Sequence, residues 1–396
     1  MPRNLWFIVV GMAINVTGAS FLWPLNTIYL HDHLGKSLSV AGLVLMANAF
    51  ATVVGNLIGG YLFDKIGGYR SIVAGTVITL SALIGLTINH DWPLYVVWLI
   101  IIGFGSGLIF PAMYAMAGTV WKEGGRRAFN AVYVAQNLGV AVGSALGGLV
   151  ASFSFDYIFI ANTIMYVVFF LLVVLTYKNI ESDPVANVNV IPAHQPIKSD
   201  RMLYALLVLC IGYLLCWVGY VQWTATISAY TQEIGVSLRQ YSLLWTINGA
   251  LIVLGQPFVN KIVYTFMKKV KQQMIVGMII FMGSFVVAAF ASDFSGFLTA
   301  MIILTIGEML VWPAVPTIAS ELAPNGKEGF YQGIVNSTAT AGRMIGPLLG
   351  GLLVDHYGMQ MMFIVLMALF VIAIGTTLIY DKILRKTYSE QMAVTK

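Results

Sequence analysis

The stretch FLTAMIILTIGEMLVWPAV, residues 297–315, is followed after a short polar loop by YQGIVNSTATAGRMIGPLLGGLLV, residues 331–354. Each run is long and apolar enough to cross a bilayer, and each carries one charge, Glu308 in the first and Arg343 in the second. A charge at mid-bilayer costs about 2.5–3.5 kcal/mol on insertion scales, so such residues are normally buried in protein, paired and functional. We therefore expect Glu308 to bind a proton or a cationic ligand, and Arg343 to belong to the same proton-coupling site. The alternative is that the two form a static structural ion pair.

The composition indicates a membrane protein. Of 396 residues, 59% are hydrophobic and only 9% are charged, whereas about a quarter of the residues of soluble domains are charged. A membrane-spanning helix needs about 20 apolar residues. The chain contains twelve such runs: 4–30, 37–62, 70–89, 93–117, 128–152, 156–177, 202–230, 240–264, 272–291, 295–320, 329–354 and 359–380. We therefore predict an all-α integral membrane protein with twelve transmembrane helices.

The basic residues predict the orientation of the chain, because cytoplasmic loops are rich in Lys and Arg. With both termini in the cytoplasm, only Lys36 and Arg239 of the 21 Lys and Arg lie outside, and Arg343 lies within the membrane. The first apolar run lacks a small-residue cleavage site and is expected to remain as a span. Cys210 and Cys216 fall inside a span, so we expect no disulfide framework.

The two halves of the chain resemble each other. Gly105 and Pro111 recur at one constant offset as Gly307 and Pro313. A polar, proline-containing stretch lies between the halves and is typical of a linker. We predict a six-helix bundle over 1–177, a cytoplasmic linker over 178–201, and a second six-helix bundle with a short cytoplasmic tail over 202–396.

A short motif ends the second apolar run. It contains Gly60, Asp64, Lys65 and Gly67 and is followed by Arg70. Glycines allow helix ends to approach, and an acid beside bases at a helix end can hold neighbouring helices. The motif resembles the major facilitator superfamily signature G-x-L-x-D-R-x-G-R-R between helices 2 and 3. The resemblance implies a transporter fold in which Asp64 stabilises the outward-open state across the domain interface. The usual basic residues at the end of the motif are replaced, which makes Arg70 a candidate partner of Asp64.

Two glycine series form a second motif. They are Gly139, Gly143, Gly147 and Gly148 in 128–152, and Gly342, Gly346, Pro347, Gly350 and Gly351 in 329–354. Both resemble the antiporter motif G-x-x-x-G-P-x-x-G-G, which is associated with exporters. The alternative is generic packing, because small residues at spacings of four let helix backbones touch.

Aromatic and amide side chains inside the spans are candidates for a substrate cavity. Tyr213, Trp217 and Tyr220 share one helical face, and Trp312 follows Glu308 by one turn. An aromatic face near an acid can hold a lipophilic cation by stacking and cation–π attraction. Lipid-facing or interfacial aromatics are the alternative. The amide candidates are Asn15, Asn26, Gln136, Asn137, Asn248 and Asn336, and for the first two the alternative is interhelical hydrogen bonding.

The chain as a whole is similar to the proton-coupled multidrug exporters of Gram-positive bacteria. The phrases Ala135-Gln136-Asn137-Leu138 and Gly307-Glu308 look like the lactococcal type of this family. The resemblance implies a monomeric secondary transporter in the bacterial plasma membrane, exchanging protons for lipophilic or cationic drugs. Its partners would be a small amphiphilic substrate, protons and the lipid bilayer, with no nucleic acid. The proton gradient would replace any cofactor or metal.

Other functions remain open from the sequence. A lipid or glycolipid flippase would share the fold and the proton coupling, and a sugar or metabolite exporter would share the fold. A non-transporting sensor or a membrane enzyme belongs to a different class. The spans show no nucleophile–base pair, metal cluster or phosphate-binding loop, so we expect no enzyme activity.

Overall fold

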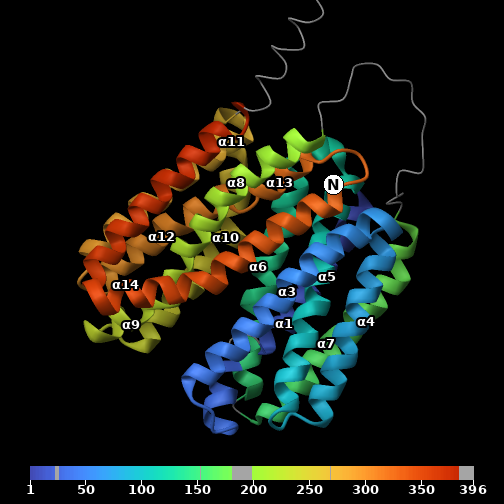
Figure 1. Ribbon diagram of the computed structural model, residues 1–396, viewed down its shortest axis with the longest axis horizontal. Helices are drawn as coiled ribbons and strands as arrows, with labels where there is room; N and C mark the ends of the chain where they lie inside the picture. Colours follow the sequence, from blue (N-terminus) through green and yellow to red (C-terminus); the bar gives the residue numbers. More distant parts are fainter. Residues whose placement is uncertain (23–25, 152, 181–198, 268, 383–396) are drawn as a thin grey trace, which may run out of the picture. The chain divides into compact units, whose positions relative to one another are not determined.

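The computed structural model of the chain describes residues 1–22, 26–151, 153–180, 199–267 and 269–382. Over these residues all regular secondary structure is helical. The chain divides into two compact units, which are Met1–Ala186 with Gly326–Ser337, and Asn187–Asn325 with Thr338–Lys396. Within each unit the long helices run side by side (Figure 1). Most of the predicted linker 178–201 and of the C-terminal tail falls outside the described residues, so the predicted boundary between the halves stays a prediction.

The first unit is built from the helices that precede the linker, together with the segment Gly326–Ser337. These are α1 (Arg3–Leu22), α2 (Asn26–Ile28), the π-helix η2 (Tyr29–His33), α3 (Leu38–Ile66), α4 (Gly68–Ile88), α5 (Leu94–Val120), η3 (Lys122–Gly124), α6 (Arg126–Ala151), α7 (Phe155–Thr176) and η4 (Tyr177–Asn179). The largest side chains buried in this unit are aromatic and include Tyr95, Phe159, Tyr166 and Phe169. They fill the core between the helices.

The second unit is built from the helices that follow the linker. These are α8 (Ser199–Tyr220), η5 (Val221–Trp223), α9 (Thr226–Glu233), α10 (Leu238–Phe266), α11 (Val270–Phe290), α12 (Phe294–Val311), α13 (Ala314–Leu322) and α14 (Glu328–Ile379) from Thr338 onward, since the start of α14 belongs to the first unit. The 52-residue α14 is interrupted at Gly358, whose φ of 80° is a left-handed conformation that glycine adopts without steric cost. Gly358 therefore separates the two spans predicted over 329–354 and 359–380.

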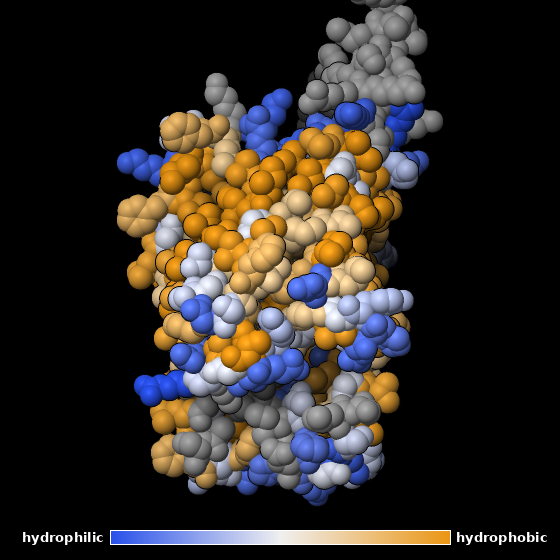
Figure 2. All heavy atoms as spheres, turned by 90° about the vertical axis from the view of Figure 1, so that its left-hand side faces the viewer, coloured by the Kyte–Doolittle hydropathy of each residue, from blue (hydrophilic) through white to orange (hydrophobic). Residues whose placement is uncertain are grey.

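Ten helices of the described chain are long and apolar enough to cross a membrane. The two spans that meet at Gly358 count among them as one helix. The fifth predicted span is α6, which is not among the ten and carries Arg126, Arg127 and several amides. Large apolar side chains also cover much of the surface (Figure 2), and Phe258, Phe266 and Phe290 are 73%, 77% and 85% exposed. An apolar helical surface of this kind suits contact with lipid, because the hydrocarbon region does not tolerate exposed polar backbone groups.

One predicted span is broken beside its acid. The run 295–320 forms α12 and α13, separated at Trp312 and Pro313. Proline lacks a backbone N–H and its ring clashes with the preceding turn, so it interrupts the helical hydrogen bonds. The last bond of α12 runs from the Trp312 N–H to the Glu308 carbonyl oxygen at 3.1 Å. The break therefore lies one turn after Glu308.

The internal repeat extends to the local geometry of the second and eighth predicted spans. Helices α3 and α10 both contain 29 residues, and Ser37 and Ser237 are their N-caps. Gly35 and Gly235 stand at the same position before the two caps, with φ values of 62° and 85°. Serine caps stabilise helix starts by accepting a bond from a free backbone N–H. The same capping device therefore starts the equivalent helix in each unit.

The repeat also extends to helix packing. A Cβ placed on Gly75 of α4 would lie 2.8 Å from the carbonyl oxygen of Gly105 in α5. A Cβ on Gly277 of α11 would lie 3.1 Å from the carbonyl oxygen of Gly307 in α12. In both units the backbones of these two helices touch, because glycine leaves no side chain between them. Gly105 and Gly307 therefore correspond in their helix contacts as well as in sequence.

Candidate functional site

Glu308 lies inside the second unit, near the end of α12, and is only 2% exposed. Its Oε1 accepts a hydrogen bond from Nδ2 of Asn248 in α10 at 3.0 Å. The same Nδ2 donates to Oγ1 of Thr305 at 2.9 Å, and the Thr305 hydroxyl donates to the Met301 carbonyl oxygen at 2.7 Å. Buried polar groups are costly unless they are hydrogen-bonded. Two helices thus supply a polar setting for this acid, and its role in proton coupling stays a prediction.

The equivalent place in the first unit has the amide but not the acid. Asn48 stands as far from its N-cap serine as Asn248 does, and its Nδ2 donates to the Leu99 carbonyl oxygen at 2.6 Å. By the offset that matches Gly105 with Gly307, Ser106 occupies the position of Glu308. The acid is therefore an addition to a scaffold that both units share.

Four predicted aromatic residues come together one turn from Glu308. The rings of Trp217 and Trp312 stack with centroids 4.3 Å apart and planes 11° apart. Tyr213 and Tyr220 meet Trp312 edge-on at 5.8 and 5.4 Å. Trp217 and Trp312 form a cluster with the two tyrosines in the second unit, and these rings pack on one another rather than facing lipid singly. Trp245 of α10 touches the margin of this aromatic cluster through Tyr220 at 6.3 Å.

Arg343 lies over the aromatic cluster. Its guanidinium carbon is 4.9 Å from the centre of the Trp217 ring, and its Nη2 donates to Thr340 Oγ1 at 3.3 Å. Trp312 is 7% exposed, Trp217 is half-buried and the Arg343 side chain is exposed. The three groups therefore form a layered stack that runs from the protein interior to an accessible cation. Glu308 and Arg343, predicted to share one site, both lie in this unit.

The glycines of α14 bring its backbone against α8 and η5. A Cβ on Gly342 would lie 2.5 Å from the Trp217 Cβ, and one on Gly346 would lie 3.2 Å from the Val218 Cα. Gln222 occupies the space beside Gly350, and its Nε2 donates to the Gly346 carbonyl oxygen at 2.7 Å. Two further members of the predicted motif differ from these: Gly351 has open space where a Cβ would be, and Pro347 is exposed.

The glycines of α6 do the same against α1 in the first unit. A Cβ on Gly139 would lie 2.7 Å from the Ala13 carbonyl oxygen, and one on Gly147 would lie 3.1 Å from the Phe21 Cα. Gly143 approaches the Thr17 carbonyl oxygen between them. Gly148 continues the helix. Both glycine series therefore pack helices closely, and their association with export remains a prediction.

Asp64 is held by the start of α14, within the first unit. Its two carboxylate oxygens accept from the backbone N–H groups of Gly329 and Phe330 at 2.7 and 2.8 Å. The N-terminus of a helix carries a partial positive charge that favours an anion. A Cβ on Gly60 would lie 3.1 Å from the Phe330 Cα, so this glycine permits the close approach. The signature motif thus binds a helix end, while its predicted control of an outward-open state stays a prediction.

The remaining residues of this motif lie around the turn between α3 and α4. Gly67 has a φ of 86° and joins the two helices. Lys65 is exposed, and its Nζ donates to the Tyr61 hydroxyl at 2.9 Å. Arg70 is exposed as well. It forms no ion pair with Asp64 among the described residues, so the expected partner is replaced by backbone N–H groups.

The amides predicted for a cavity in the first part of the chain, together with Asn336, lie in the first unit. Asn26 accepts from the Tyr95 hydroxyl at 2.8 Å, and Gln136 accepts from the Tyr114 hydroxyl at 2.8 Å. Asn137 and Asn336 donate to carbonyl oxygens one turn earlier, at 2.9 Å in each case. The Asn26 bond matches the alternative of interhelical hydrogen bonding, whereas the Asn137 and Asn336 bonds stay within one helix. Asn15 differs, because it is fully buried and neither amide atom has a protein hydrogen-bond partner within the described chain.

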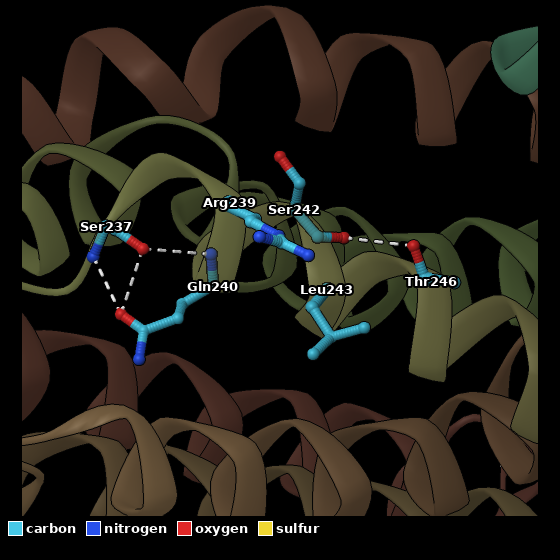
Figure 3. Close-up of a pocket in the computed structure, with 6 residues that line it drawn as sticks. All are labelled: Ser237, Arg239, Gln240, Ser242, Leu243 and Thr246. Carbon is cyan, nitrogen blue, oxygen red and sulfur yellow. Dashed lines mark hydrogen bonds between the residues drawn. The ribbon is translucent and has the colours of Figure 1, made fainter.

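A hollow of about 640 Å³ lies beside the first turns of α10 (Figure 3). It is lined by Ser237, Arg239, Gln240, Ser242, Leu243 and Thr246. Ser237 is the N-cap of the helix: its Oγ accepts from the Gln240 N–H, and its own N–H donates to Gln240 Oε1. No residue predicted for the site lines this hollow. The sequence offered no signal for it beyond the serine before an apolar run.

Comparisons with known proteins agree on one family. The Major Facilitator Superfamily model matches residues 8–269 and 223–391. The MFS-type transporter YttB of Bacillus subtilis (strain 168) is 61% identical over 382 residues, which cover 96% of each chain. Multidrug resistance protein MdtH of Aeromonas hydrophila subsp. hydrophila is 22% identical over 361 residues, covering 90% of this chain and 88% of MdtH. The human organic anion transporter MFSD10 shares the fold, with a TM-score of 0.77 at 12% identity over 95% of this chain and 100% of that chain.

The chain therefore belongs to the Major Facilitator Superfamily, whose members are transporters and not enzymes. It is a multi-pass membrane protein with the all-α, two-half architecture of that family. The family and the fold class predicted from the sequence are confirmed.

Proposed function

We propose that this transporter exports amphiphilic compounds in exchange for protons, with Glu308 as the proton-carrying group. The observation that carries the proposal is a carboxyl group that is 2% exposed, hydrogen-bonded to Asn248, and one helical turn from the aromatic cluster. A buried carboxyl beside a ligand surface can exchange its proton when its surroundings change. A compact polar metabolite would need more hydrogen-bonding groups than this aromatic surface offers.

Two further observations support drug efflux over other transport. The multidrug resistance protein MdtH is related over most of both chains. The α14 sequence Gly342–Gly351 contains the complete antiporter motif, including Pro347. Both are consistent with a bacterial plasma-membrane exporter whose termini lie in the cytoplasm.

The mechanism we propose is alternating access, in which the binding site opens to one side of the membrane and then to the other. With the site open outward, a proton neutralises Glu308 and the substrate leaves. With the site open inward, the proton is lost and a new substrate is bound. Each cycle couples one movement of cargo to the downhill entry of protons, because the two bind to one site in turn.

Exchange of Glu308 for Gln tests this proposal. Glutamine keeps the size of the side chain and an oxygen that accepts from Asn248, but it cannot take up or release a proton. In proteoliposomes with an imposed pH gradient, Glu308→Gln is expected to abolish uphill export of a fluorescent amphiphile while the protein still folds and binds it. Glu233→Gln, at the exposed end of α9, is the matched control and should export normally. Uphill export by the Glu308→Gln variant would refute the assignment.

A further inference from the structure

Arg343 is a cation that lies over the outer ring of the stacked pair Trp312 and Trp217. The two indole planes are 11° apart, and the guanidinium lies over the outer one. Stacking uses the face of a planar guanidinium, whereas hydrogen bonds to an oxyanion use its edge. An arginine held over a ring can recognise a carboxylate, sulfonate or phosphate through its N–H groups. Its backing by two rings holds the group in place, which lowers the entropy lost on binding.

Helix packing alone does not require this stack. Gly342 packs on Trp217 as Gly139 of the first unit packs on Val16. The residue after the glycine is Arg343 in the second unit and Val140 in the first. The same close contact between helices is thus made in the first unit without arginine or tryptophan. The charge and the rings are additions of the second unit, as Glu308 is.

The exposure of the stack places its charge where a ligand reaches it. Arg343 is exposed, while Trp312 beneath it is 7% exposed. Arginine stays protonated under all physiological conditions, so this charge persists whether or not Glu308 carries a proton. A purely cationic compound is repelled by it, and an acidic one is attracted. The stack therefore discriminates between amphiphiles by the sign of their charge.

We propose that Arg343, on its Trp217–Trp312 support, is an oxyanion-binding subsite, and that the cargo is an amphiphile in which a carboxylate, sulfonate or phosphate stands beside an apolar or aromatic body. This inference rests on the proposed function as an exporter and names its class of substrate. It narrows the cationic and lipophilic compounds expected from the sequence to compounds that carry an acidic group, with or without a cationic one.

Binding of a matched series of naphthalene probes tests the subsite. The probes are 2-naphthalenesulfonate, 2-naphthoate, the neutral 2-naphthalenemethanol and 2-naphthylmethylammonium, titrated into the purified full-length protein by calorimetry. We expect the two anions to bind at least about tenfold more tightly than the alcohol, because a hydrogen bond to a charged partner contributes that much or more. Arg343→Gln should remove this difference. Arg343→Lys should retain only part of it, because lysine keeps the charge but not the planar fork.

Arg239→Gln is the matched control, since Arg239 is an exposed arginine of the same unit that lies in the hollow beside α10. It should leave the preference for anions unchanged. Thermal unfolding of each variant checks its fold. Val140→Arg, which places an arginine at the matching position of the first unit, is a second control. Equal affinity of wild type and a folded Arg343→Gln for the sulfonate would overturn the inference, as would tighter binding of the ammonium probe.

Two further measurements separate this inference from the proposed function. If the sulfonate binds through Arg343 but is never exported against a gradient, the export proposal fails and the subsite stands. If Glu308-dependent export occurs only for cations, the subsite proposal fails and export stands. Vesicles with and without phosphatidylglycerol decide the source of the oxyanion. Competition by this lipid that is lost in Arg343→Gln assigns the subsite to a lipid headgroup, and its absence assigns it to a free acid.

Discussion

At the scale of single residues, Asp64 and Glu308 show two ways to keep an acid on an apolar helix. Asp64 accepts hydrogen bonds from two backbone N–H groups at the start of α14, so both of its carboxylate oxygens are used as acceptors. Glu308 accepts a hydrogen bond from the side-chain amide of Asn248. An amide N–H can donate to the ionised or to the protonated carboxyl group. The first arrangement suits a fixed structural contact, and the second suits a group that changes its protonation.

Asp64→Asn is expected to destabilise the first unit. Asparagine keeps one oxygen for Gly329 or Phe330 but loses the charge and the second acceptor, and hydrogen bonds to charged groups contribute about 1.5–3 kcal/mol each. Thermal unfolding of the purified protein in detergent should show a clearly lower midpoint than wild type. Lys65→Gln, one residue away and exposed, should unfold like wild type. An unchanged midpoint for Asp64→Asn would show that the contact with α14 is not stabilising.

At the scale of helices, the two glycine series are equivalent packing surfaces. In α6 and in α14 the glycines let the backbone approach the first helix of the same unit, α1 or α8. The motif was predicted as a sign of export, and the contacts show that close packing is at least one of its roles. Within α14, however, the motif positions are not equivalent. Trp217 occupies the space that a side chain at Gly342 would need, whereas Gly351 faces open space.

Gly342→Ala should therefore lower the stability of the protein, and Gly351→Ala should raise it. A methyl group at Gly342 would stand 2.5 Å from the Trp217 Cβ, and overpacking of this kind costs about 1–3 kcal/mol. The same change at Gly351 meets no atom within 4 Å, and replacing a mid-helix glycine stabilises by about 0.5–1 kcal/mol. Unfolding midpoints of the two variants measure both effects. Equal destabilisation of the two variants would contradict the packing argument.

At the scale of the whole molecule, the predicted orientation in the membrane rests on charge rather than on any one contact. The distribution of Lys and Arg predicts cytoplasmic termini, with Lys36 outside and the loop that contains Glu123 inside. Neither Lys36 nor Glu123 is deeply buried, whereas both native cysteines are buried. Single cysteines can therefore be introduced with little background labelling.

Cysteine labelling of intact cells measures this orientation. In a variant without Cys210 and Cys216, Lys36→Cys should react with a membrane-impermeant maleimide. Glu123→Cys should react only after the cells are permeabilised. The reverse pattern would invert the predicted topology, and with it the direction of the proton and substrate movements proposed above.

The fold was largely predictable from particular residues. Apolar runs of about 20 residues can satisfy their backbone in a bilayer only as helices, so the runs read from the sequence recur as helices. The breaks at Trp312–Pro313 and at η5 were not predicted, because hydropathy measures the length of an apolar run and not its continuity. The burial of Glu308 was expected, whereas the identity of its partner, Asn248, depends on how α10 lies against α12.

The sequence by itself determined that this chain is an all-α membrane protein built as a repeat, and it identified Glu308, Arg343 and the aromatic residues as exceptional, because charge and hydropathy are properties of the chain itself. Only the tertiary structure decided which of these residues meet. It stacks Arg343 on Trp217 and Trp312, bonds Glu308 to Asn248, and gives Asp64 the backbone of α14 in place of Arg70. Such contacts join residues far apart in sequence. Their geometry depends on how the helices pack at their glycines, and a single sequence does not show which helices pack together.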